Sequence, residues 1–365
     1  MDQSGSRHLD FGIFDWIDDA GRDPAKTYEG RLRLVEYADR AGFWGYHLAE
    51  HHGTPLGTAP SPNVFLAAAA ARTTRIRLGA LVNVVTMYQP LRLIEEVCML
   101  DQISGGRLEL GLGRGASPVE LGFYGVDASR TREIYAEAFE VIMRALRTGV
   151  VEADGPYFRY PPSRLTVPPR QLPHPPLWYP TTNADTVPWL GRNAINTLFA
   201  FVCDLAFARA GTTVGAQIAV YERELAAHAG EGERLNAHLA HPHYGISRHV
   251  HVADSDERAL REARPAHDRF FESFNRLWLE HQGHDYYTSD FEDAVERGFF
   301  LVGSPATVAE RIAAQVAEQG GNYFVAVFCY GDLRPEWSLR SIELFAEQVI
   351  PAVRRRLAGA SPAVS

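Results

Sequence analysis

Glu50, His51 and His52 stand side by side where the apolar stretch WGYHLA gives way to a loop of small residues and prolines. A histidine can donate, accept or shuttle a proton near neutral pH, and a neighbouring carboxylate can set its tautomer and raise its pKa. Neighbouring side chains of an extended segment point to opposite sides, so we expect only one of the two imidazoles to face a site. The triplet predicts an acid–base or hydrogen-bonding centre. A pair of loop histidines satisfied by local hydrogen bonds is the alternative.

The elements that must position this triplet are short apolar runs alternating with longer amphipathic stretches. The pattern predicts strands at 9–17, 44–50, 75–85, 106–115, 175–181, 195–202, 244–253 and 321–330. Between and after them it predicts helices at 26–43, 61–74, 89–106, 131–149, 184–193 and about 206–229, one beginning at 254, and a last one at 338–357.

Strand–helix units in series favour a parallel sheet closed into a (β/α)8 TIM barrel, and we expect one barrel domain over 1–365. Two segments interrupt the rhythm. The proline-rich insertion near 150–176 is expected to hold a small antiparallel excursion, and the aromatic, acidic insertion near 270–300 is expected to be a lid or binding loop. A packed surface insertion is the alternative for both. In this fold Glu50, His51 and His52 lie at the carboxyl end of the second strand, which forms the active-site mouth.

Composition excludes several classes of function. The 365 residues carry a net charge of −9 with acids and bases interleaved, which disfavours binding to nucleic acid or to an anionic membrane. No apolar run reaches the roughly 18 residues of a transmembrane helix, and the first residues lack a signal-peptide pattern, so we expect a cytoplasmic location. Cys98, Cys203 and Cys329 are far apart and fit buried thiols better than disulfides or a zinc site.

Other motifs give weaker evidence of function. The pairs His249-x-His251 and His241-x-His243 have metal-ligand spacing, but residues two apart on a strand share a face for many reasons, and we expect no metal. GLGRG is not a dinucleotide-binding GxGxxG, and no GxSxG indicates a serine hydrolase.

The motifs LAEHH and RIRLGALVNVVTMYQPLRLIEEVCMLDQISGGRLELGLGRG, followed by PPLWYPTTNADTVPWLGR and VGSPATVAERI, resemble the bacterial luciferase-like flavin-dependent monooxygenases. The resemblance covers most of the chain. It implies a barrel that holds reduced FMN, supplied by a separate flavin reductase, and that uses molecular oxygen to oxidise a small-molecule substrate. It assigns a catalytic role to His51, as a base or as a hydrogen-bond partner of substrate or peroxide, with Glu50 and His52 in support.

The same resemblance assigns cofactor-binding residues. Arg114, in GRG after the fourth strand, matches the phosphate-binding arginine of the family, and a guanidinium suits a phosphate. A rim arginine paired with a carboxylate is the alternative. A second phosphate-binding segment corresponds to TTNADT, with Thr182, Asn183 and Thr186, although luciferase itself has an acidic residue and a serine there; ordinary helix capping is the alternative. The family often has a non-proline cis peptide against the flavin ring, which falls near Leu81 and Val82, with Asn83 in reach of the flavin edge.

Alternatives within and beyond the family stay open. A deazaflavin-dependent oxidoreductase shares the barrel and transfers hydride without oxygen, and a non-catalytic flavin-binding protein has the site without turnover. Aromatic residues hint at an apolar substrate pocket, although they suit a core equally well: Trp16, Tyr88, Trp178 and those of 270–300. Relatives dimerise through the alanine-rich region, so we expect a homodimer through helices near 62–72 and 88–102.

Overall fold

The structure is a computed structural model that describes residues 8–18 and 21–359. Its centre is a ring of parallel strands: β1 (Asp10–Asp15), β2 (Gly45–Leu48), β3 (Arg77–Val84), β4 (Leu108–Gly113), β7 (Leu177–Trp178), β8 (Thr197–Phe199), β9 (Tyr244–Val252) and β11 (Tyr323–Val327). Each pairs with the next and β11 returns to β1, while a single bridge from Trp178 to Asn196 joins β7 to β8. The predicted TIM barrel is therefore confirmed.

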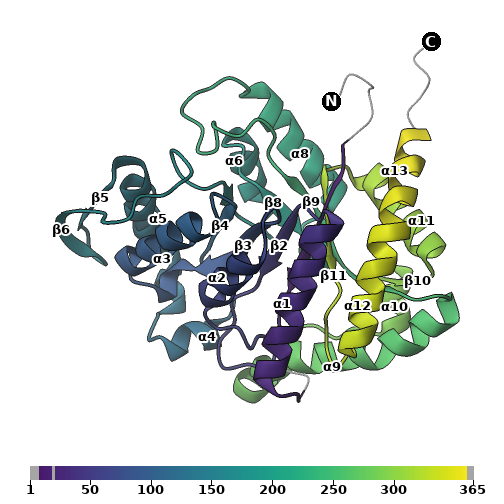
Figure 1. Cartoon of the computed structure of the whole chain (residues 1–365). Helices are drawn as coiled ribbons and strands as arrows, with labels where there is room; N and C mark the ends of the chain where they lie inside the picture. The colour runs from purple at the N-terminus through teal and green to yellow at the C-terminus, as the bar shows by residue number, and fades with distance from the viewer. Residues whose placement is uncertain (1–7, 19–20, 360–365) are drawn as a thin grey trace, which may run out of the picture.

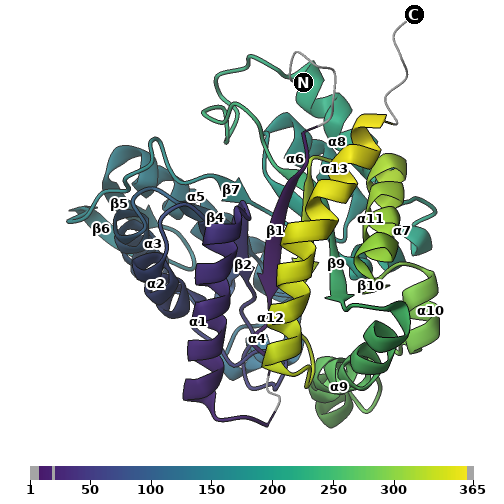
Figure 2. The same cartoon turned by 45° about the vertical axis from the view of Figure 1, so that its right-hand side comes forward.

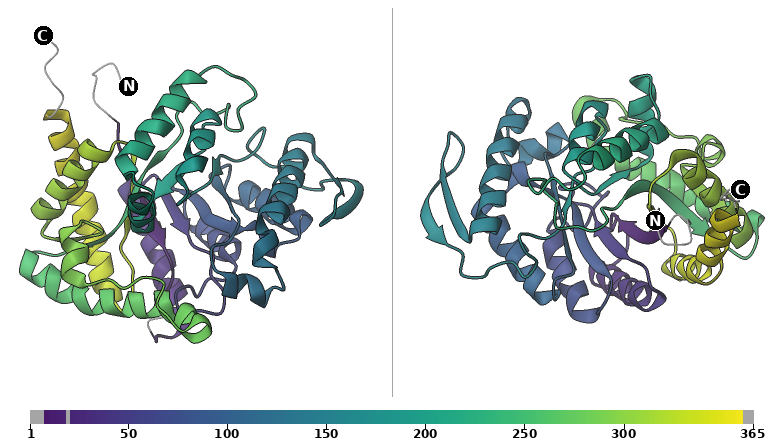
Figure 3. Two further views of the ribbon diagram at one scale, coloured as in Figure 1. Left: turned by 180° about the vertical axis from the view of Figure 1, so that it is seen from behind. Right: turned by 90° about the horizontal axis from the view of Figure 1, so that it is seen from above.

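Helices surround this ring (Figure 1; Figure 2; Figure 3). They are α1 (Pro24–Ala41), α2 (Pro62–Arg72), α3 (Pro90–Ile103), α5 (Thr131–Thr148), α6 (Val187–Arg192), α8 (Val214–Ala227), α11 (Pro305–Gln319), α12 (Pro335–Leu344) and α13 (Ile350–Gly359), with the π-helical turn η4 (Phe345–Val349) between the last two. In α1 the Asp23 carboxylate caps the first turn, the buried Val35 and Ala38 face the sheet, and Gly42 ends the helix at φ 84°. None of the described helices is both long and apolar enough to cross a bilayer.

The amino end of the barrel is filled by side chains. Tyr323 extends across the interior, and it fits only because Gly12 and Gly45 lack side chains: a Cβ on Gly12 would lie 1.9 Å from the Tyr323 hydroxyl. That hydroxyl lies 2.9 Å from His47 Nε2. The cavity of the barrel lies at the other end, where its lining comes from residues at and after the carboxyl ends of the strands.

The first interruption of the rhythm is as predicted. Strands β5 (Val150–Asp154) and β6 (Arg159–Arg164) form an antiparallel hairpin that projects away from the barrel (Figure 1). The three cysteines are buried and free, as expected.

The second half differs from the prediction in two details. The segment 270–300 is not a loop but consists of the end of the 27-residue helix α9 (Asp256–Gln282), followed by α10 (Phe291–Glu296) and by β10 (Phe300–Gly303), an additional strand beside the second half of β9. The strand formed by the short FFLVG run was not predicted because the run follows an aromatic stretch. The helix expected at 206–229 is two helices, α7 (Phe201–Arg209) and α8, because Gly211 adopts φ 72° between them.

Short elements complete the end at which the barrel strands finish. The helix α4 (Pro118–Phe123) follows β4, and the turns η1 (Val85–Met87), η2 (Ala128–Arg130) and η3 (Ala184–Thr186) follow β3, α4 and β7. Helix α9 runs across this end beside α4 (Figure 1, bottom). Both helices therefore border the opening of the barrel.

Candidate active site

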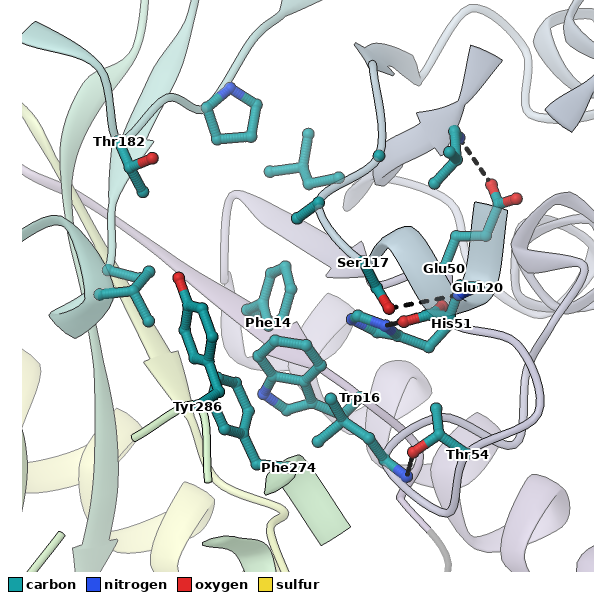
Figure 4. Close-up of a pocket in the computed structure, with 18 of the residues that line it drawn as sticks. Phe14, Trp16, Glu50, His51, Thr54, Ser117, Glu120, Thr182, Phe274 and Tyr286 are labelled. Carbon is teal, nitrogen blue, oxygen red and sulfur yellow. Dashed lines mark hydrogen bonds and ion pairs between the residues drawn. The ribbon is translucent and has the colours of Figure 1, made fainter. Parts of the chain in front are cut away.

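A cavity of about 370 Å³ opens at the carboxyl ends of the barrel strands. Its wall is mostly apolar, and it draws residues from loops far apart in sequence (Figure 4). Phe274, Leu277, Trp278 and Tyr286 come from α9 and the loop after it, so the aromatic segment that the sequence singled out forms one wall. Of the aromatic residues proposed outside that segment, Trp16 lines the cavity, whereas Tyr88 and Trp178 do not.

His51 is the imidazole that faces this cavity. Its Nδ1 lies 3.1 and 3.2 Å from the two carboxylate oxygens of Glu120, and its ring stands 5.3 Å from the ring of Trp16. Figure 4 shows the ring directed from Glu120 towards the cavity. A carboxylate on Nδ1 favours the tautomer with its proton there and leaves Nε2 as an acceptor on the cavity side.

Glu120 is held in place by several hydrogen bonds. Ser117 Oγ accepts from the Glu120 backbone N–H at 3.3 Å, and the His52 backbone N–H donates to the carboxylate at 2.8 Å. Burial by itself would raise the pKa of Glu120, but the hydrogen bond and charge of His51, together with the His52 N–H, lower it overall. The carboxylate is therefore ionised at neutral pH and orients His51.

Glu50 and His52 form a second, separate pair. Glu50 Oε1 lies 3.0 Å from His52 Nε2, and Oε2 accepts from the Val84 N–H at 2.9 Å and from the Tyr88 hydroxyl at 3.1 Å. The other His52 nitrogen lies 2.8 Å from the hydroxyl of Tyr124. Glu50 is thus not the carboxylate partner of His51. Glu50 lines the cavity and connects the loop after β2 to β3 through its hydrogen bonds. Its partner His52 is buried and does not line the cavity.

Sequence reasoning missed Glu120, which lies 69 positions from His51. A signal was present: Ser117 and Glu120 have the S-x-x-E spacing of a capping box directly after GRGA. In the structure the serine caps α4, whereas the glutamate side chain turns to His51 and His52. The capping pattern marks the helix start, but only the fold shows what the glutamate contacts.

Arg114 follows β4 at the same end of the barrel as His51. Burial raises the pKa of Tyr179, and the positive charges of Arg114 and Arg132 partly offset that rise, so both arginines approach this tyrosine. Among the described residues neither guanidinium has a carboxylate partner. The alternative of a rim arginine paired with a carboxylate therefore does not apply to Arg114. Arg132 was not predicted.

The glycines on either side of Arg114 allow close packing within the sheet. A Cβ on Gly113 would lie 2.1 Å from a Val82 methyl group, and one on Gly115 would lie 2.9 Å from a Val84 methyl group. These glycines allow β4 and its exit to pack closely on β3.

The remaining predicted cofactor residues divide between the cavity and its surroundings. Leu81 lines the cavity, and its peptide bond to Val82 is cis, as expected. Asn83 was expected at the flavin edge, but its amide donates to the Gly111 carbonyl at 3.0 Å and it does not line the cavity. The reason is the irregular register between β3 and β4, which turns this side chain to the neighbouring strand.

The TTNADT loop contributes one of its three predicted residues to the cavity. Thr182 lines the side opposite His51 (Figure 4). Asn183 is exposed, and its side chain accepts from the Asp185 N–H at 3.1 Å, so it caps a turn. Thr186 is half-buried at the start of α6, away from the cavity lining.

The two HxH pairs do not converge on a metal. His249 lines the cavity, whereas His251 Nε2 lies 2.9 Å from Glu262 of α9. His243 lies 2.9 Å from Asp10 at the amino end of the barrel. Within 8–18 and 21–359 no group of three His, Cys, Asp or Glu side chains is placed to hold an ion.

Comparison with known proteins agrees with this geometry. The family described as luciferase-like monooxygenase matches residues 9–323. The uncharacterized protein y4wF of Sinorhizobium fredii is 38% identical over 91% of this chain and 93% of its own length. The 4-hydroxyprotoasukamycin monooxygenase of Streptomyces nodosus subsp. asukaensis is 30% identical over 96% of this chain and 94% of its own.

Solved structures share the fold. Monooxygenase RslO1 from Streptomyces bottropensis superposes with a TM-score of 0.81 at 26% identity, covering 94% of this chain and 99% of its own. The oxygenating constituent of 3,6-diketocamphane monooxygenase of Pseudomonas putida, a complex with FMN, superposes with a TM-score of 0.75 at 21% identity, covering 94% and 98%.

Proposed function

Because the chain belongs to the luciferase-like monooxygenase family and is thus an oxidoreductase, we propose that it uses reduced FMN and molecular oxygen to oxidise a small, largely apolar organic substrate. The observation that carries this proposal is the Glu120–His51 pair on the wall of an apolar cavity, with Arg114 directly before the lining residue Gly115. Reduced flavin supplies the two electrons with which one oxygen atom enters the substrate and the other leaves as water.

In this proposal His51 is the group that touches the reacting atoms. Glu120 fixes the imidazole so that Nε2 accepts a proton, or a hydrogen bond, at the cavity surface. The apolar wall excludes water from the same space and so protects a reactive species from hydrolysis. Glu50 and His52 keep the loop that carries His51 against β3, and we assign them a positioning role.

The phosphate of FMN is proposed to bind between Arg114 and Arg132, with Thr182 donating from the facing loop. The residues present fit this group, since the positive charges of both arginines act on Tyr179 and neither guanidinium has a carboxylate partner among the described residues. A doubly charged phosphate suits such a pair because each guanidinium offers several parallel donors. The solved FMN complex of a protein with the same fold supports FMN as the cofactor.

Titration of the protein with reduced and oxidised FMN, riboflavin and a reduced deazaflavin tests the cofactor. Riboflavin lacks the phosphate, so Arg114→Ala should weaken FMN binding about tenfold or more and leave riboflavin binding unchanged. Arg159→Ala removes the same charge from the exposed hairpin and serves as the control. Equal losses of affinity for FMN and riboflavin would show that Arg114 does not bind the phosphate. If the protein bound only the deazaflavin tightly, the proposed monooxygenase activity would be wrong and a hydride-transfer enzyme would be the better assignment.

The catalytic assignment of His51 has its own test. In His51→Ala, FMN binding should persist while oxidation of substrate, supported by a flavin reductase, falls at least about 100-fold. A wild-type protein that binds FMN and consumes no candidate substrate would favour a non-catalytic flavin-binding protein. A separate reductase is part of the proposal because the solved FMN complex is likewise an oxygenating constituent.

We also propose a homodimer through α2 and α3. These helices expose large apolar side chains: Val64 is 72%, Met99 53% and Ile103 50% exposed. Burying such a surface against a second copy is favourable in proportion to its apolar area. Light scattering on a sizing column should give twice the chain mass, and Met99→Asp should shift it towards the monomer. A monomeric wild-type protein would refute this proposal.

A further inference from the structure

His249 occupies the inner face of β9 and lines the cavity while only 3% of its surface is exposed. Aromatic rings fix its orientation. The imidazole stacks on Phe300 at 4.3 Å with 8° between the planes, and it meets the edges of Phe270 at 4.6 Å and Tyr330 at 5.2 Å. Such a packed ring has one accessible orientation, so its polar atoms point in fixed directions.

Neither ring nitrogen of His249 has a hydrogen-bond partner among the described residues, and Nε2 is fully buried. Burial, with smaller contributions from the charges of His267 and Arg248, lowers the pKa of His249 to about 3. The imidazole is therefore neutral at physiological pH, with one nitrogen as a donor and the other as an acceptor. A buried polar group without a partner is costly, and native structures usually provide one.

The position of His249 relative to His51 indicates what that partner is. The ring of Trp16 stands 5.3 Å from His51 and 6.0 Å from Phe270, which in turn contacts His249. His51, Trp16 and His249 all line the cavity, and Phe270, which is not part of the lining, contacts both Trp16 and His249. A ligand that reaches both imidazoles has an apolar body flanked by two polar contacts.

We propose that His249 binds the substrate through a hydrogen bond to a carbonyl or hydroxyl oxygen remote from the atom that is oxidised. This inference rests on the proposed function and narrows its substrate class to compact, mostly hydrocarbon ketones and alcohols. The hydrocarbon part would pack against the aromatic wall formed by Phe274, Trp278 and Tyr286. Figure 4 shows Phe274 and Tyr286 on this wall. His249 favours ligands that carry this oxygen, because a ligand without it leaves the imidazole without a hydrogen-bond partner.

The test compares three probes with one carbon skeleton: ethylbenzene, 1-phenylethanol and acetophenone. Calorimetric titration of the protein without flavin measures their affinities independently of turnover. We expect the wild-type protein to bind the two oxygenated probes more tightly than ethylbenzene. His249→Phe should lower their affinities about fivefold to tenfold and leave that of ethylbenzene within about twofold.

Phe274→Leu is the matched control, since trimming the apolar wall should weaken all three probes by similar factors. His249→Gln retains a donor and an acceptor and should restore part of the preference for oxygen. Equal losses for all probes in His249→Phe, no change in any, or no binding of acetophenone by the wild-type protein at millimolar concentration would each overturn the proposal. The FMN titration stands apart from these measurements, so failure of the cofactor proposal is distinguishable from failure of this one.

Discussion

His47 and His249 are two buried histidines on the inner face of one barrel, at opposite ends. Burial lowers the pKa of each to about 3, assisted for His47 by the charges of His243 and Arg77. Their surroundings differ in one respect. His47 Nε2 is hydrogen-bonded to the Tyr323 hydroxyl at 2.9 Å, whereas the His249 ring has no hydrogen-bond partner within residues 8–18 and 21–359 and lines the cavity.

The same contrast extends to their neighbours. At the closed amino end, Glu109 accepts from the Trp178 indole N–H at 2.5 Å, from the Arg77 guanidinium, and from the Asn196 amide at 3.4 Å. At the open end, Trp16 Nε1 is buried and has no hydrogen-bond partner among the described residues. Within the same part of the chain, His47 Nδ1 also has none. Polar groups at the closed end mainly hydrogen-bond one another and hold strands together, whereas those of Trp16 and His249 do not join such a network among the residues that the structure describes.

Glu109→Ala should give the largest effect at the closed end. Glu109 is 1% exposed, and its removal takes away the ion-pair partner of the partly exposed Arg77 and leaves the buried Trp178 N–H without its acceptor. We expect the free energy of unfolding to fall by about 3 kcal/mol or more, measured by urea denaturation. Glu109→Gln retains an acceptor for Trp178 and should lose less.

Asp154→Ala, which breaks an exposed ion pair with Arg159 on the hairpin, is the control for loss of a carboxylate and should have no measurable effect. A loss in Glu109→Ala no larger than that of this control would mean that the polar network at the closed end does not stabilise the barrel.

The unequal success of sequence reasoning follows the same division. Alternating apolar runs and amphipathic helices predict the barrel, because burying one face of each element leaves few architectures. The position of His51 at the end of a strand then predicts its place at the mouth. Glu120 escaped prediction because it reaches His51 from a different loop, and the amide of Asn83 because side-chain direction depends on a local irregularity between β3 and β4. The short strand β10 was not predicted because it lies in an aromatic stretch that also contains a helix.

Replacing each buried histidine by phenylalanine gives an intermediate effect that compares the two ends directly. His47→Phe leaves the Tyr323 hydroxyl buried without a partner, and should lower the free energy of unfolding by about 1–3 kcal/mol. His249→Phe removes an unpaired polar group from an aromatic cage and should leave stability unchanged or slightly higher. Urea denaturation of both variants at pH 7.5 measures the difference. Equal destabilisation would show that His249 has a partner in the ligand-free protein, such as a trapped water.

The smallest expected effect is a change in how stability depends on pH. The unfolded chain protonates both histidines near pH 6.5, whereas the folded protein keeps them neutral down to about pH 3. Between these values the unfolded state binds more protons, so acidification destabilises the fold and stability rises with pH. Removing either histidine should flatten this slope by at most about 1.4 kcal/mol per pH unit. The measurement is urea denaturation from pH 7.5 to 4.5 for the wild-type protein and the two phenylalanine variants. If His47→Phe flattens the slope and His249→Phe does not, solvent reaches His249 in the folded protein, and the open end is wetter than its aromatic cage implies.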